Sequence, residues 1–183
     1  MTVLVAARKN PQLSGMLCAV AMSDMMNKRG IEAVAVAGEK PAAGTMSVFA
    51  RLGLLPPEEQ VSFAGRRVAL AGAKDGFADL PALKEGAVTA SLDADYLDTL
   101  LAGQPLAAWT WPQGCAATVL KGMHDFYSME LSRGLAAALL TACLEETQQL
   151  AKATEADKKA AAVLAAMADV ADIAAFGKDM LQG

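Results

Sequence analysis

The chain is poor in the residue types that most often build chemical or cross-linked sites. Its 183 residues contain one histidine, three cysteines and 5% aromatic residues, and basic residues are fewer than acidic ones. Cys18, Cys115 and Cys143 are odd in number, have no Cys-x-x-Cys spacing and lie in apolar stretches, so we expect reduced, packed thiols rather than a disulfide framework. A net charge of −4 with scattered lysine and arginine argues against a nucleic-acid or anionic-membrane partner.

The sequence also lacks an apolar run long enough for a membrane span or a signal peptide. The longest run, Gly134 to Leu144, is about half of the ~20 residues that a bilayer requires, and two glutamates follow it. The first apolar run ends at Arg8, short of the ~7–15 residues of a signal-peptide core. We therefore expect a cytoplasmic protein without a membrane partner.

Apolar runs that alternate with helical spacing predict a single α/β domain over residues 1–183. The expected strands are 2–7, 31–37, 67–71, 87–92 and 106–111, and the expected helices among them are 15–29, 45–52 and a weak one near 80–84. After Pro112 the pattern is helical, over 114–126, 130–152, 154–170 and 172–181. This alternation predicts an open, mostly parallel sheet of about five strands with helices on both faces and an all-helical C-terminal third.

Several single features have structural interpretations. Thr154 to Asp157 has the form of a capping box, and Asp172 is placed to cap a helix that begins at Ile173. His124, the one histidine, is expected to be structural or on the surface, and the methionines of segment 15–29 to be core residues more than a partner surface. No P-loop or dinucleotide-binding glycine spacing is present.

Three segments carry a family resemblance. Residues 7–21, Ala-Arg-Lys-Asn-Pro-Gln-Leu-Ser-Gly-Met-Leu-Cys-Ala-Val-Ala, are similar to Gly-His-x-Asn-Pro-Asp-Thr-Asp-Ser followed by a small-residue helix. Residues 112–120, Pro-Gln-Gly-Cys-Ala-Ala-Thr-Val-Leu, are similar to Pro-x-Gly-Cys-Thr-Ala-Thr-x-Leu, and residues 175–181 to Tyr-Gly-x-x-Met-Leu. The chain resembles the N-terminal domain of the manganese-dependent family II inorganic pyrophosphatases, within the DHH phosphoesterases. The resemblance implies a DHH-like fold, and a second domain that we expect to be absent here.

That family's chemistry uses two divalent metals that activate a bridging water, and this sequence departs from the metal-binding motifs. In the first motif, Arg8 stands in the place of histidine, and Gln12 and Ser14 stand in the places of aspartates. Residues 72–74 read Gly-Ala-Lys where the second motif has Asp-His-Asn. The carboxylate that would bridge the two metals is therefore missing.

The two remaining motifs are also changed. Asp93 matches the aspartate of Asp-His-His, but Ala94 and Asp95 replace both histidines, and Glu146 replaces the aspartate of the fourth motif. Because a hard divalent cation usually needs about three or more protein donors, we predict no metal cofactor and no catalytic residue. The expected function is that of a non-catalytic interaction or regulatory protein with an unidentified partner.

The sequence is compatible with two other functions. A metal-free pocket for phosphate or nucleotide could form at a helix N-terminus, with the candidate residues Arg8, Ser14, Lys74, Asp93, Asp95 and Glu146. Alternatively, the side chains of Arg8 and Lys74 form ion pairs with Asp93, Asp95 or Glu146, and these ion pairs fill the site. The second function is a residual phosphoesterase, which would use Asp93, Asp95 and Glu146. A homodimer through the strand that carries Trp109 and Trp111 is also expected from the resemblance and from the large area of these side chains.

Overall fold

The computed structural model describes residues 1–7, 12–60, 62–71, 86–93, 107–110 and 114–182, with the backbone alone at 91, 93 and 107–110. The strands are β1 (Val3–Ala6), β2 (Ala33–Ala37), β3 (Glu58–Glu59), β4 (Arg67–Ala71), β5 (Ala87–Asp93) and β6 (Ala107–Thr110). The helices are α1 (Leu13–Lys28), α2 (Ala43–Leu52), α4 (Ala116–Phe126), α5 (Arg133–Glu146), α6 (Glu155–Met167) and α7 (Ile173–Gln182). The predicted α/β class and the helical last third are confirmed.

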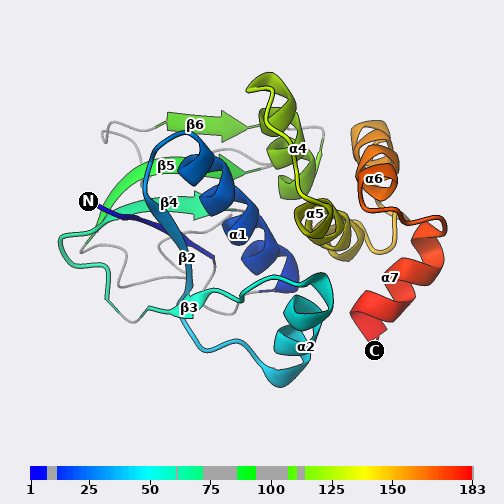
Figure 1. Ribbon diagram of the computed structural model, residues 1–183, viewed down its shortest axis with the longest axis horizontal. Coiled ribbons are helices and arrows are strands. Elements are labelled where there is room, and N and C mark those ends of the chain that lie inside the picture. The colour runs from blue at the N-terminus through cyan, green and yellow to red at the C-terminus, as the bar shows by residue number, and fades with distance from the viewer. Residues whose placement is uncertain (8–11, 61, 72–85, 94–106, 111–113, 183) are drawn as a thin grey trace.

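The strands form one parallel sheet in the order β3-β2-β1-β4-β5-β6 (Figure 1). From β1 the chain crosses to β2 on one side, and it later returns to β4 on the other side. The order therefore reverses between β1 and β4, and ligands of open parallel sheets bind at such a reversal, beyond the carboxyl ends of the strands. All five predicted strands are confirmed, and β3 is an additional two-residue strand where none is predicted.

Alternation along the strands gives the sheet two buried faces. On one face Val3 and Val5 join a large core with α1, α4 and α5, and α5 also packs against α1, α4, α6 and α7. On the other face Leu4 and Ala6 join a smaller core with Phe63, which is 1% exposed. The described helices contribute to the first core. The helix predicted near 80–84 lies outside the described residues, so helical cover of this second face stays a prediction.

The strand β6 stands at one end of the described sheet, which is the position that the predicted homodimer requires. Trp111 and the side chain of Trp109 lie outside the described part of the chain. The pairing of two copies therefore stays a prediction.

Helix α5 is shorter than the sequence pattern indicates. It ends at Glu146, not at Lys152, because Gln148, Gln149 and Leu150 have φ values of 54°, 58° and 68° and turn in the left-handed sense. The hydroxyl of Thr147 accepts a hydrogen bond from the Leu150 N–H at 3.2 Å and donates one to the Cys143 carbonyl at 2.6 Å. These local bonds hold a turn that is costly for residues other than glycine.

Local predictions about caps and thiols are confirmed. The Thr154 hydroxyl accepts from the Asp157 N–H at 3.2 Å and the Asp157 carboxylate accepts from the Thr154 N–H at 3.0 Å, which completes the capping box. Asp172 accepts from the Ala175 N–H at 2.9 Å. The three cysteines form no disulfide and are buried, and the four methionines of α1 are also buried. Among the described helices, none combines the length and the apolar character that a bilayer crossing needs.

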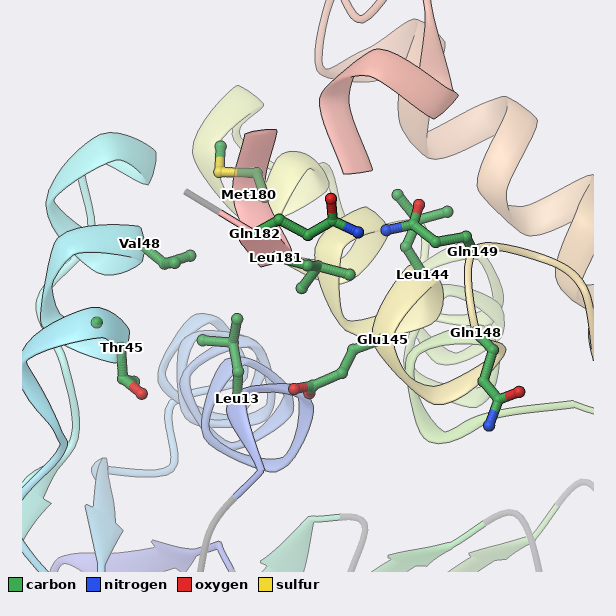
Figure 2. Close-up of a pocket in the computed structure, with 11 residues that line it drawn as sticks. Leu13, Thr45, Val48, Leu144, Glu145, Gln148, Gln149, Met180, Leu181 and Gln182 are labelled. Carbon is green, nitrogen blue, oxygen red and sulfur yellow. The ribbon is translucent and has the colours of Figure 1, made fainter. Parts of the chain in front are cut away.

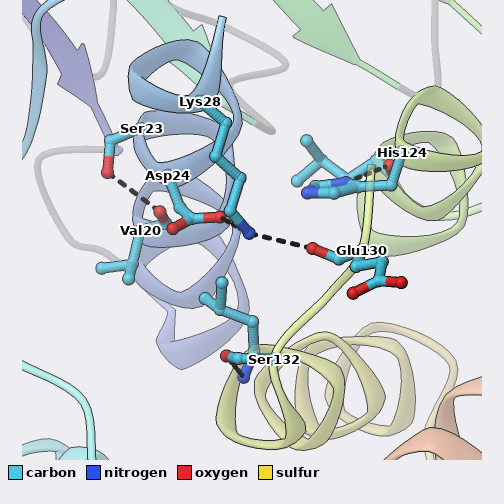
Figure 3. Close-up of polar contacts among 9 residues, drawn as sticks. Val20, Ser23, Asp24, Lys28, His124, Glu130 and Ser132 are labelled. Carbon is cyan, nitrogen blue, oxygen red and sulfur yellow. Dashed lines mark hydrogen bonds and ion pairs between the residues drawn. The ribbon is translucent and has the colours of Figure 1, made fainter. Parts of the chain in front are cut away.

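The single histidine is a buried residue of α4. His124 is 1% exposed, its Nδ1 lies 2.9 Å from the Leu120 carbonyl oxygen and its Nε2 has no hydrogen-bond partner. The ring faces α1, where Lys28 forms an ion pair with Asp24 at 2.8 Å and donates to the Glu130 carbonyl at 2.9 Å (Figure 3). Burial lowers the pKa of His124 from its usual 6.5, and the nearby Lys28 lowers it further.

This burial predicts a loss of stability on the acid side of neutrality. Because the pKa of His124 is lowered in the folded state, the unfolded chain binds the proton more readily, and stability falls as the pH drops below 6.5. His124→Gln removes the titration while an amide can still donate to the Leu120 carbonyl. Urea unfolding between about pH 7.5 and 5.5 should therefore show a smaller decline for the variant. Equal declines for the two proteins would contradict this assignment.

Candidate functional site

Two helix N-termini meet near the carboxyl edge of the sheet. The helix α1 follows β1, at the point where the strand order reverses, and α4 follows β6. Their N-cap residues, Gln12 and Cys115, make no side-chain capping hydrogen bond. The first backbone N–H groups of a helix have no partner within the helix and carry a partial positive charge, so both ends require acceptors from elsewhere.

The acceptors come from adjacent residues at the end of α5. The carboxylate of Glu145 accepts from the backbone N–H of Ser14 in α1, and that of Glu146 accepts from the N–H of Ala116 in α4 at 3.2 Å. Neighbouring side chains on a helix point about 100° apart, which allows one turn of α5 to reach both helices that pack against it. The carboxylates therefore occupy the positions where these helix ends would attract an external anion.

A third carboxylate strengthens the start of α4. Asp157 of α6 is 2% exposed and accepts from the Cys115 N–H at 2.8 Å, the Thr118 hydroxyl at 2.6 Å and the Thr154 hydroxyl at 2.9 Å. Burial by itself raises the pKa of Asp157, but these hydrogen bonds outweigh it and hold the pKa below its usual value. Gly114 allows this approach, since a Cβ there would lie 3.1 Å from the Asp157 carboxylate.

Two thiols lie beside this carboxylate. The sulfur atoms of Cys115 and Cys143 and a carboxylate oxygen of Asp157 all lie within 4.8 Å of one another, which is a possible metal-ligand spacing. The Asp157 carboxylate already accepts hydrogen bonds from Cys115, Thr118 and Thr154. The pKa of Cys115 is raised by its hydrogen bond to Cys143 and by burial, which disfavours the thiolate that a metal needs. We interpret the group as packed thiols around a structural carboxylate.

A cavity of about 450 Å³ opens beside the α1 terminus (Figure 2). Leu13 of α1, Thr45 of α2 and Glu145 of α5 line it together with the amides of Gln148, Gln149 and Gln182. Glu145 is the one charged side chain among the described lining residues. A negative charge among amides and apolar groups does not favour a phosphate ligand.

The candidate residues predicted from the sequence are only partly described. Ser14 lies next to the last turn of α5, which contains Glu146. Its backbone N–H donates to the carboxylate of Glu145, a residue that was not predicted from the sequence. Asp93 ends β5 and its backbone alone is described. Three candidate residues lie outside the described part of the chain: Arg8, Lys74 and Asp95.

Comparisons with known proteins support the resemblance. The chain is 28% identical over 190 residues to a protein of Archaeoglobus fulgidus described as a manganese-dependent inorganic pyrophosphatase. It is 30% identical over 174 residues to one of the same description from Deinococcus radiodurans. The chain is pyrophosphatase-like. No family model matches it.

Solved structures show the same fold for this pyrophosphatase-like chain. A Methanococcus jannaschii protein described as a family II inorganic pyrophosphatase superposes with a TM-score of 0.83 at 24% identity and covers the whole chain. An exopolyphosphatase-related protein of Bacteroides fragilis superposes with a TM-score of 0.70 at 8% identity. The fold is that of the family's N-terminal domain. The chain spans 59% and 55% of the two curated relatives' lengths.

The capping role of Glu145 predicts a specific loss of stability in this pyrophosphatase-like chain. Glu145→Ala leaves the Ser14 N–H without its acceptor and should lower the free energy of unfolding by about 1–3 kcal/mol, whereas Glu145→Gln, which keeps an acceptor oxygen, should cost less. Glu39→Ala removes an exposed glutamate after β2 and is the matched control. Urea denaturation measures the free energy of unfolding of the three variants. If Glu145→Ala and Glu39→Ala are equally stable, Glu145 is not a cap.

Proposed function

We propose that this chain is a pyrophosphatase-like domain that does not hydrolyse phosphoanhydrides and acts through interaction instead. Glu145 and Glu146 support the proposal, because their carboxylates cap the N-termini of α1 and α4. In an open parallel sheet these helix ends are where an anionic substrate is bound. Here the same positions hold side chains of the chain itself.

The described residues do not fit the manganese centre that the names of the relatives imply. The resemblance compares Gln12, Ser14 and Glu146 with metal ligands of the family. The Gln12 side chain is exposed, Ser14 is held through its backbone by Glu145, and Glu146 accepts from the Ala116 N–H. One engaged carboxylate, an amide and a hydroxyl are a poor donor set for hard divalent cations. We therefore derive no catalytic step through a metal at this edge.

The charge at the edge also disfavours the metal-free phosphate binder as the function. An anion at the α1 terminus would have to displace Glu145 from the Ser14 N–H, or lie beside it and be repelled by it. Arg8 and Lys74, the cations of that hypothesis, lie outside the described residues. Binding of inorganic phosphate must therefore be measured together with its release.

The test is a phosphate-release assay on the full chain with pyrophosphate and with polyphosphate, in Mn²⁺ and in Mg²⁺. We expect turnover below the ~1 per second that is typical of slow enzymes. The Archaeoglobus fulgidus relative, assayed in parallel, is the positive control, and calorimetric titration with inorganic phosphate tests the binder. Metal-dependent turnover above ~1 per second would refute the proposal, and saturable phosphate binding without turnover would establish the metal-free binder instead.

A further inference from the structure

A second cavity lies at the opposite end of α1, near the amino edge of the sheet. Its volume is about 370 Å³, within the ~300–1,000 Å³ of small-molecule sites. The lining side chains come from α1 and the residues after it, from β4, from β5 and from the end of α4: Met22, Met25, Met26, Arg29, Ile31, Arg67, Thr89, Ala90 and Tyr127. We infer that this cavity binds an anionic amphiphile, meaning a carboxylate or phosphate monoester attached to an apolar body.

The floor of the cavity suits the apolar body. Met22, Met25 and Met26 follow one another at helical spacing, and Met22 and Met25 are each 1% exposed. Ile31 and Ala90 extend the same surface onto the sheet side. Methionine side chains are flexible and polarisable, so they adapt to chains and rings of different shape. The floor therefore selects for hydrophobicity more than for one outline.

The rim of the cavity selects for negative charge. Arg29 and Arg67 are both exposed, and neither makes an ion pair with a carboxylate in the described part of the chain. No acidic residue is among the described lining residues. The Arg29 guanidinium lies 4.0 Å from the centre of the Tyr127 ring, a cation–π contact that limits its freedom. Two guanidinium groups of this kind match the geometry of carboxylate and phosphate oxygens.

Two other arginines of the chain, Arg51 and Arg133, are arranged differently. Arg51 pairs with Asp179, and Arg133 pairs with Asp169 at 3.6 Å and donates to the Ala168 carbonyl at 3.2 Å. These two arginines have acceptors within the chain, whereas Arg29 and Arg67 border the apolar surface of the cavity and have no side-chain acceptor among the described residues. The cavity is also remote from Glu145, since α1 separates the two ends. The inference is therefore independent of the proposed function.

The test is calorimetric titration of the full chain with four ten-carbon probes, each kept below the concentration at which it forms micelles. Decanoate and decyl phosphate carry the two anionic head groups, decanol is neutral and decyltrimethylammonium is cationic. The double variant Arg29→Gln/Arg67→Gln removes both guanidinium groups. Arg66→Gln is the matched control, because Arg66 precedes Arg67, is not a lining residue and loses the same type of charge.

We expect decanoate or decyl phosphate to bind saturably, and the tighter of the two identifies the head group. The double variant should weaken binding at least about tenfold, while Arg66→Gln should change it less than about twofold. Because both arginines are exposed, we expect the double variant to fold normally. An unchanged melting temperature will show this. The inference is overturned if neither anion binds, if decanol or the cation binds equally well, or if Arg66→Gln weakens binding as much as the double variant.

Discussion

The rest of the structure depends on the electrostatics of helix ends at one edge of a parallel sheet. Parallel strands joined by crossover helices bring the N-termini of α1 and α4 to the carboxyl side, each with backbone N–H groups that need an acceptor. In this chain Glu145 and Glu146 supply the acceptors from a single turn of α5. The packing of α5 across α1 and α4 is thus also the arrangement that satisfies their polar ends.

Under the proposed function, the same contacts would stabilise a pyrophosphatase-like fold that binds neither metal nor anionic substrate at this edge. A bound anionic substrate supplies negative charge at such helix ends, so a domain that binds none needs another source of negative charge there. The glutamates provide it within the chain, and the buried carboxylate of Asp157 adds acceptors at the start of α4. The proposed lack of catalysis is therefore compatible with the shared fold.

Local signals in the sequence predicted much of the fold, and contacts between distant residues account for what they missed. The capping box at Thr154 and the cap at Asp172 are local patterns, and both are confirmed. The contact of Glu145 with Ser14 joins residues 131 positions apart, so no spacing rule selects Glu145. The early end of α5 was missed because Gln148 to Leu150 turn left-handed without a glycine, held by the hydroxyl of Thr147.

Protein carboxylates, rather than an external anion, accept from the N–H groups at these helix ends, and under the proposed function no Mn²⁺ binds beside them. Addition of Mn²⁺ to isotopically labelled protein tests it directly, because the paramagnetic ion broadens the amide resonances of residues close to its binding site. We expect the Ser14 and Ala116 signals to keep their intensity relative to amides at the opposite end of α1, near Lys28, at stoichiometric Mn²⁺. Selective and saturable loss of those two signals at one ion per chain would contradict it.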